Sequence, residues 1–167
     1  MTLDQLNQLD ATQFTQALAA IFEHSPWVAE RSWARRPFAS VDALHSALCQ
    51  TLASADIDDK LRLIRAHPRL AGKAAIRGEL TAASTAEQSS AGLGHCSPEE
   101  FARISELNDA YDQRFGFPFI LAVRGQTRSS IIAQMAARID HSRDAEIAEA
   151  LLQIERIATF RLADTIG

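Results

Sequence analysis

Apolar side chains recur at helical spacing along most of this chain. Phe14, Leu18 and Ile21 follow Asp10 at intervals of three or four residues, which places them on one face of an α-helix. Because a glutamine stands three residues after Asp10, the start also fits a capping box, and we predict a helix over residues 10–26. A serine followed by a proline at the first helical position predicts a short helix over residues 25–33. Apolar spacing predicts helices over residues 40–52 and 56–67 and, near the end of the chain, helices that include residues 131–139 and 147–158.

Two segments depart from this pattern. Residues 72–94 are rich in alanine, serine, threonine and glycine and can bury little apolar surface, so we predict a loop and then a short helix over residues 84–91. Residues 117–125, FPFILAVRG, form an apolar run of strand length, but no second strand is predicted to pair with them. We therefore expect a lone extended segment whose backbone N–H groups need other partners.

A clear helix start lies between these segments. Ser97 is a typical capping residue, Pro98 suits the first helical position, and Glu100 completes the pattern three residues after the serine. The helix should end at Gly116. With no repeat or linker dividing it, the chain is predicted to be one all-α domain over residues 1–167, with about seven or eight helices.

Composition and charge exclude several classes of protein. Apolar residues make up 47% and charged residues 23% of the chain, as in ordinary globular proteins. A net charge of -4 provides no basic surface for nucleic acid. The first residues, MTLDQLNQLDATQF, lack the positive region and apolar core of a signal peptide, and no apolar run could span a membrane. We expect a soluble cytoplasmic protein in which Cys49 and Cys96 are reduced thiols.

Common cofactor and metal motifs are absent. The sequence contains no GxxxxGK[ST], GxGxxG, GxSxG or HExxH motif, and no cysteine or histidine pair has zinc spacing. We therefore expect neither a metal site nor a phosphate-bearing cofactor.

Three polar residues fit a simple helical bundle poorly. His67 continues the stripe of Ile57, Leu61 and Ile64 and precedes a proline, which disfavours the α conformation of the residue before it. Its ring could therefore reach outward from a helix end, although a cap or a satisfied surface histidine is an equally simple interpretation. Arg161 lies on the apolar side of the last predicted helix, where it needs an anion, an internal salt bridge or a path to the surface.

Glu87 also allows two interpretations. Ser84 and Glu87 match the S/T-x-x-E capping box, so a helix start would account for both residues. Alternatively, the segment EQSS at residues 87–90 gathers a carboxylate, an amide and two hydroxyl groups that could line a small polar pocket.

Four motifs taken together resemble a known family. They are AHPRLAG at residues 66–72, STAEQ at residues 84–88, LNDAYDQRFGFPFILAVRG at residues 107–125 and ERIATFRL at residues 155–162. Their order and spacing resemble the OHCU decarboxylase family of urate degradation over essentially the whole chain. OHCU is 2-oxo-4-hydroxy-4-carboxy-5-ureidoimidazoline.

The resemblance implies a cofactor-independent, all-helical homodimer that converts OHCU to (S)-allantoin. It implies that His67 is the catalytic acid, that Glu87 holds the ring and hydroxyl of the substrate, and that Arg161 binds an anionic group. The remaining residues that it implies for substrate binding are Pro68, Ser84, Thr85, Ala86, Gln88, Phe119, Ile120, Leu121, Ala122 and Val123.

These residue types suit decarboxylation. A histidine can handle a proton near neutral pH, and an arginine fork matches planar oxygen pairs. The residues alone leave two other functions open. One is a hydrolase of a related ureido compound, in which His67 and Glu87 activate water, and the other is a helical binding module without catalysis.

Overall fold

The computed structural model describes all residues, 1–167, and it contains helices but no strand. This confirms the all-α fold class. Three of the ten α-helices have six residues or fewer, and the other seven agree with the predicted number. The α-helices are α1 (Leu3–Gln8), α2 (Ala11–Ala17), α3 (Trp27–Ser32), α4 (Val41–Ser54), α5 (Ile57–Ala66), α6 (Lys73–Ile76), α7 (Ala82–Ser90), α8 (Pro98–Phe115), α9 (Arg128–Arg138) and α10 (Arg143–Thr165), with short 3₁₀ turns η1 (Trp33–Arg35) and η2 (Leu93–His95).

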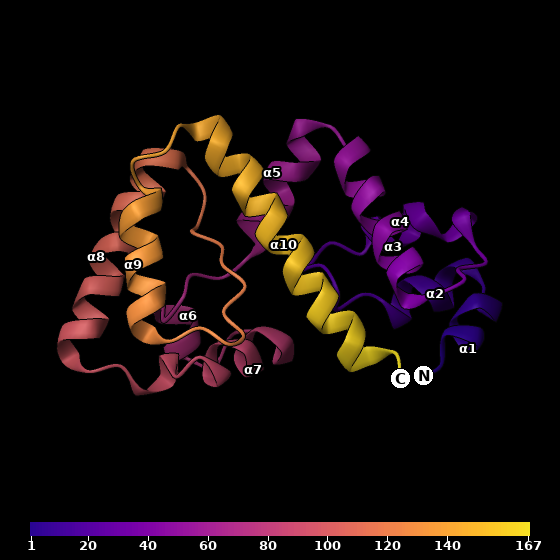
Figure 1. Cartoon of the computed structure of the whole chain (residues 1–167), viewed down its shortest axis with the longest axis horizontal. Coiled ribbons are helices and arrows are strands. Elements are labelled where there is room, and N and C mark those ends of the chain that lie inside the picture. The colour runs from indigo at the N-terminus through magenta and orange to yellow at the C-terminus, as the bar shows by residue number, and fades with distance from the viewer. The chain divides into compact units, whose positions relative to one another are not determined.

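The chain divides into two compact units. The first contains Met1–Ala66 and Ile154–Gly167, and the second contains His67–Gln153. Helix α10 therefore contributes residues to both units (Figure 1). A single domain over residues 1–167 stays a prediction.

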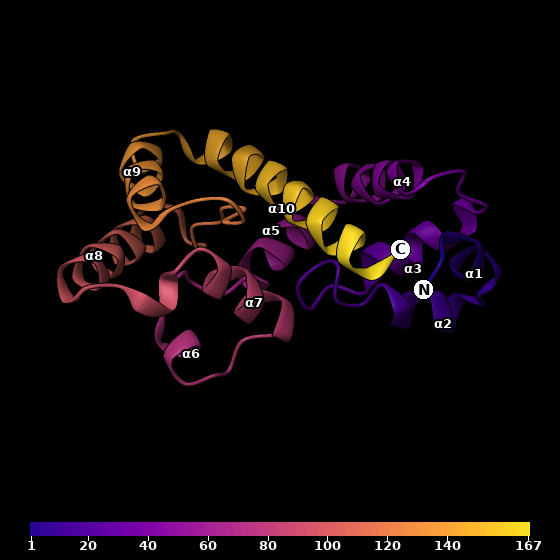
Figure 2. The ribbon, with the colours of Figure 1, turned by 60° about the horizontal axis from the view of Figure 1, so that its bottom comes forward.

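The first unit encloses its own apolar core. Phe14, Leu44, Leu48 and Ile64, from three different helices, are completely or almost completely buried. The two ends of the chain lie side by side in this unit (Figures 1 and 2), where the Gly167 N–H donates to the Met1 carbonyl at 3.2 Å.

The helix predicted over residues 10–26 is shorter than expected. The Asp10 cap is confirmed, with its carboxylate accepting from the Gln13 N–H at 2.8 Å, but α2 ends at Ala17. Leu18 and Ile21 are still buried, because tight turns such as the one closed by the Ile21 N–H and the Leu18 carbonyl keep both side chains on the inner side. The apolar spacing therefore predicted correctly that Leu18 and Ile21 are buried, but it overestimated the length of the helix.

In the second unit, α8 and α9 lie side by side (Figure 1). The Ser97 capping box at the start of α8 is confirmed. Tyr111 of α8 contacts Phe117 and Phe119 edge to face, with ring centroids 6.0 and 5.4 Å apart. These contacts anchor the extended segment that follows α8, and residues 117–123 form neither helix nor strand, as predicted.

A buried charged cluster also holds this segment. Arg138 donates to the Ile120 carbonyl at 2.7 Å and to the Glu146 carboxylate at 2.9 Å. Glu146 also accepts from the Tyr111 hydroxyl at 2.6 Å. Burial and the neighbouring Glu146 carboxylate raise the pKa of Tyr111 well above its usual range, so this hydroxyl remains a donor.

Candidate active site

His67 lies one residue beyond α5 and begins the second unit. His67 is 8% exposed, so the predicted position at a helix end on the apolar stripe is confirmed, whereas the expectation that its ring reaches outward or lies at the surface is wrong. The helix itself begins as predicted, with the Asp56 carboxylate accepting from the Asp59 N–H at 2.8 Å. Pro68 follows His67 and is partly exposed.

The loop after Pro68 turns sharply. Ala71 has a φ of 48°, in the left-handed region that residues with a side chain rarely adopt. A Cβ atom on Gly72 would lie 2.9 Å from the Cβ of Arg69, so only glycine fits there without a shift of the loop. The segment RLAG is therefore a tight, specifically built turn.

Side chains from α7 and α8 fix this turn. The Gln88 amide accepts from the Ala71 N–H at 2.9 Å and donates to the Arg69 carbonyl at 3.2 Å. The Asn108 amide donates to the carbonyl of Leu70 at 2.9 Å.

The Arg69 guanidinium also holds the turn. It donates to Asp109 at 2.8 Å and makes two bonds to Asp112, both on α8. The backbone and side chains of residues 69–71 are thus connected to both neighbouring helices.

Helix α7 begins earlier than predicted. Its cap is Thr81, whose hydroxyl accepts from the Ser84 N–H at 3.2 Å. Ser84 is therefore inside the helix, and the capping-box interpretation of Ser84 and Glu87 is wrong. Two capping patterns overlap in this segment, one that begins at Thr81 and one that begins at Ser84, and the structure uses the first.

The predicted residues of α7 lie on different faces of the helix. Ser84 and Glu87 are three positions apart, so they share a face at about 100° per residue. Ser84 is buried and Glu87 half-buried, whereas Thr85 and Ala86 are exposed. Gln88, four positions after Ser84, lies on this face as well and is buried.

The buried segment of residues 119–123 has its own polar partner. The Ala122 N–H donates to the Gln153 amide oxygen at 3.0 Å. Sequence reasoning expected partners for these N–H groups but did not identify Gln153. The nearby Arg138 guanidinium lies 4.3 Å from the centre of the Phe119 ring, and all five residues of the segment are buried.

Arg161 belongs to the first unit and forms a buried ion pair. Its Nη1 atom donates to Glu23 and to the Ala20 carbonyl, both at 3.0 Å. The two side chains are 5% and 2% exposed. The internal salt bridge that the sequence left as an alternative is therefore present. The convergence of Arg161 with His67 and Glu87 stays a prediction.

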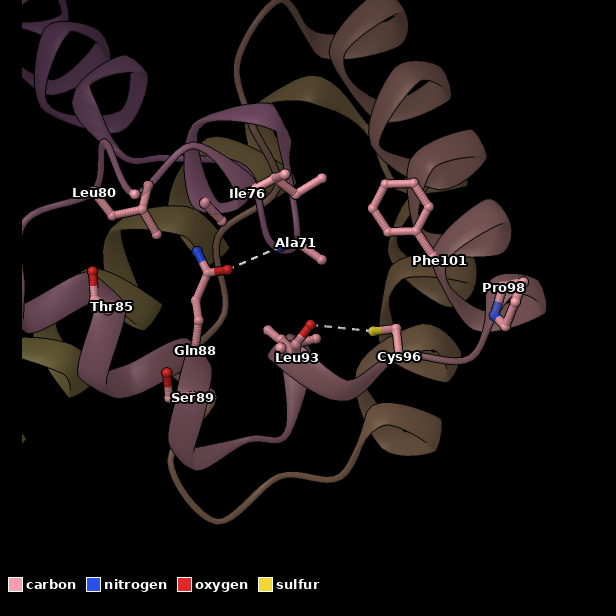
Figure 3. A pocket seen from close by; sticks show the side chains of 13 residues that line it. Ala71, Ile76, Leu80, Thr85, Gln88, Ser89, Leu93, Cys96, Pro98 and Phe101 are labelled. Atoms are coloured by element: carbon pink, nitrogen blue, oxygen red, sulfur yellow. Dashed lines mark hydrogen bonds between the residues drawn. The ribbon is translucent and has the colours of Figure 1, made fainter.

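A cavity of about 580 Å³ opens in the second unit. Figure 3 shows Thr85, Gln88 and Ser89 of α7 at this cavity, with the Gln88 amide directed toward Ala71. Most other lining side chains are apolar, and none is a lysine, arginine or histidine. An anionic ligand would find no cationic partner here, and of the predicted site residues only Thr85 and Gln88 line the cavity. The apolar residues that line it are Ala71, Ala75, Ile76, Leu80, Leu93, Pro98 and Phe101.

The two cysteines are free thiols, as predicted. Burial, and then the nearby Glu100 carboxylate, raise the pKa of Cys96 at the cavity. Burial and Glu155 raise the pKa of Cys49 to about 12. Both thiols therefore stay protonated near neutral pH and are poor nucleophiles.

No three His, Cys, Asp or Glu side chains gather in a way that could hold a metal ion, and no helix has the length and apolar character to span a bilayer.

Besides Gln153, sequence reasoning missed two buried polar residues that contact predicted site segments, Asn108 at the turn after Pro68 and Glu23 at Arg161. Asn108 lies on the buried face of α8, between Ile104 and Tyr111, and a polar side chain on an apolar stripe was an available signal. Glu23 follows two apolar residues in a segment predicted to be helical, so nothing in the sequence paired it with Arg161.

Comparisons with known proteins identify the family. Residues 7–163 match the family described as OHCU decarboxylase. The chain is 46% identical over 165 residues to the Uric acid degradation bifunctional protein PucL of Bacillus subtilis, covering 99% of this chain and 33% of that protein. It is 44% identical to the 2-oxo-4-hydroxy-4-carboxy-5-ureidoimidazoline decarboxylase of Haloferax volcanii, covering 98% of this chain and 95% of that protein. The chain thus spans a third of one relative and nearly all of the other.

Solved structures give the same result for the fold. A crystal structure of (S)-allantoin synthase matches with a TM-score of 0.80 at 29% identity, covering 100% of this chain and 54% of that one. A crystal structure of OHCU decarboxylase in the presence of (S)-allantoin matches with a TM-score of 0.71 at 22% identity, covering 89% of this chain and 96% of that one. The family match covers nearly the whole sequence, and the chain belongs to the OHCU decarboxylase family.

Proposed function

We propose that this chain decarboxylates OHCU to (S)-allantoin and that His67, Glu87 and Arg161 carry the reaction. The observation that carries the proposal is the family match over residues 7–163. Support from the structure comes from the second unit, where Gln88 bonds to the Arg69 carbonyl. That contact brings together the segments that contain Glu87 and His67.

The substrate supplies its own electron acceptor. When the bond between the ring carbon and its carboxylate breaks, CO₂ leaves and the electron pair moves into the unsaturated, carbonyl-bearing imidazoline ring. An enolate-like intermediate forms, and a proton added to one face of the carbon gives one enantiomer of allantoin. The enzyme must therefore orient the ring, stabilise negative charge and control one proton.

Each proposed residue has one of these tasks. His67 handles the proton, because an imidazole can donate and accept near neutral pH. Glu87 accepts hydrogen bonds from ring N–H and hydroxyl groups, which fixes the orientation of the ring. Arg161 binds the carboxylate or a carbonyl oxygen through its planar fork. The ion pair with Glu23 orients this fork before substrate arrives.

Supporting groups complete the proposed substrate site. We assign Pro68, Ser84, Thr85, Ala86 and Gln88 to its surroundings, as the family resemblance implies. The backbone of Phe119, Ile120, Leu121, Ala122 and Val123 is assigned to it as well.

Product analysis tests the proposed function. Freshly generated OHCU labelled with ¹³C in its carboxylate should yield labelled CO₂ and (S)-allantoin faster with the chain than without it. A hydrolase would not accelerate the release of labelled CO₂, and a binding module would change neither rate nor enantiomer. Either result would contradict the proposal.

We further propose a cytoplasmic homodimer. The free thiols agree with a reducing compartment, and Ile76, at 68% exposure, together with Phe101 gives the second unit an exposed apolar surface that a second copy could cover. Sedimentation at micromolar concentration tests the dimer, since a monomer mass would contradict it.

A further inference from the structure

Two buried amides hold the segment that follows His67 and Pro68. The Gln88 amide, on α7, bonds to the N–H of Ala71 and the carbonyl of Arg69, and the Asn108 amide, on α8, bonds to the carbonyl of Leu70. We call these two side chains, Gln88 and Asn108, the loop clamp. They satisfy backbone groups of three consecutive residues that have no helix or strand partner.

Buried amides of this kind have a specific use. A buried polar group is costly unless it is hydrogen-bonded, so apolar residues would serve better if the two positions had only to fill space. Gln88 and Asn108 are 7% and 2% exposed. Their bonds also hold Ala71 in its left-handed backbone conformation, which an alanine does not favour by itself. The loop clamp therefore selects one conformation of the loop.

We propose that the loop clamp positions the His67 imidazole for catalysis, a role that Gln88 has in addition to its assigned place at the substrate site. Arg69 is two residues after His67, so a shift of its backbone turns the peptide that carries the histidine. A misplacement of about 1 Å can lower a rate about 10²-fold. The proposal rests on the proposed function, in which His67 handles the proton.

The chemistry of Gln88 supports this assignment. Its carbonyl oxygen and its amide nitrogen both bond to backbone atoms of one turn (Figure 3 shows the bond to Ala71). Asn108 makes the equivalent bond from another helix and is not among the residues proposed to bind substrate, so its variants separate the positioning role from substrate binding.

The test uses substitutions that keep side-chain volume and remove the hydrogen bonds. They are Gln88→Met, Asn108→Leu and the double variant, with Arg103→Ala on the exposed face of α8 as the matched control. Substrate-free protein gives two readouts, the hydrogen exchange rate of the Ala71 amide and the ¹⁵N chemical shifts of the His67 ring. Steady-state turnover of OHCU gives kcat and KM.

The proposal predicts specific changes in hydrogen exchange, His67 ring shifts and kinetics. Exchange at Ala71 should be at least about tenfold faster in Gln88→Met, because the amide loses its acceptor, and the His67 ring shifts should change in both single variants. In Asn108→Leu, which removes no proposed substrate contact, we expect kcat to fall about 10–10²-fold while KM stays within about twofold. In Gln88→Met, kcat should fall by a similar factor. The double variant should be little worse than the poorer single variant, because both act on one loop.

Other results would overturn the proposal. If Asn108→Leu left kcat unchanged, or if Gln88→Met raised KM without lowering kcat, the loop clamp would not position the imidazole. Unchanged His67 ring shifts in both variants would also exclude the proposed coupling. If Asn108→Leu fails to fold, Asn108→Ser carries the same prediction. A wild-type chain that does not decarboxylate OHCU overturns the proposed function, whereas the two substrate-free readouts still test the loop clamp.

Discussion

His67 lies one residue beyond the end of α5, so a substitution there can remove the imidazole without altering the helix. We predict that His67→Asn abolishes OHCU turnover while the free energy of unfolding changes by no more than about 1–2 kcal/mol. Circular dichroism and urea unfolding would measure the fold, and OHCU decay would measure turnover. His95→Asn, at an exposed position in the same unit, is the control. Decarboxylation at the wild-type rate by His67→Asn would remove this residue from the mechanism.

A second prediction concerns the contribution of the Arg161–Glu23 ion pair to stability. Glu23→Gln leaves the buried guanidinium without its compensating charge, and breaking a buried pair typically costs about 3–5 kcal/mol. We expect the lower end of this range, because the glutamine oxygen still accepts a hydrogen bond, and we also expect a higher KM. Urea unfolding compared with Glu30→Gln, at an exposed position of α3, measures the loss. Equal stability of the two variants would show that the pair contributes little.

Sequence reasoning identified some of these residues but not their partners. His67 stood out because a proline follows a helical stripe, and Arg161 because it lies on an apolar face. Glu23 could not be matched to Arg161, since the two are 138 residues apart and their pairing depends on tertiary structure. Asn108 carried a local signal, a polar residue on a buried helix face, but its partner is a backbone carbonyl that no side-chain pattern reveals.

The start of α8 provides a prediction about pH. The Ser97 N–H donates to Glu100, and Arg128 lies 3.0 Å from the same carboxylate. These two contacts, in that order, lower the pKa of Glu100 below its usual range. A carboxyl group with a lowered pKa in the folded state stabilises the protein fully above its unfolded value, about 4.3, and this contribution is lost as pH falls through the folded value.

Wild-type protein should therefore lose its advantage over Glu100→Gln as the solution is acidified. Glutamine keeps a capping oxygen but not the charge, so we expect the difference in free energy of unfolding to be constant near neutral pH and to shrink below about pH 4. Urea unfolding at a series of pH values measures this difference. Glu99→Gln, in the same turn, is the control. A difference that stays constant through the acidic range would contradict the assignment.

Helix boundaries show where local patterns succeed. The helix starts predicted at Asp10, Ser40, Asp56 and Ser97 are confirmed, because the side chain at each of these positions accepts a hydrogen bond from a backbone N–H group of the helix. The end of α2 was predicted wrongly, since turns can bury apolar residues at the same spacing as a helix. The start of α7 was predicted wrongly as well, because Thr81 and Ser84 offer competing hydroxyl groups.

Over the chain as a whole, the fold class and the family followed from sequence because both depend on patterns that extend along most of its length. The family match over residues 7–163 confirms the resemblance, and the absence of strands confirms the all-α class. The convergence of the proposed site residues could not be predicted in the same way, because it depends on how segments far apart in the sequence meet in space. His67 and Glu87 belong to the second unit and Arg161 to the first, so their common role stays a proposal.

A crystal structure of the chain with bound (S)-allantoin would test that common role most directly. We predict allantoin with hydrogen bonds of about 2.7–3.2 Å to the His67 imidazole, the Glu87 carboxylate and the Arg161 guanidinium. Allantoin bound instead in the cavity lined by Thr85 and Phe101, in contact with none of these three side chains, would contradict the proposed active site.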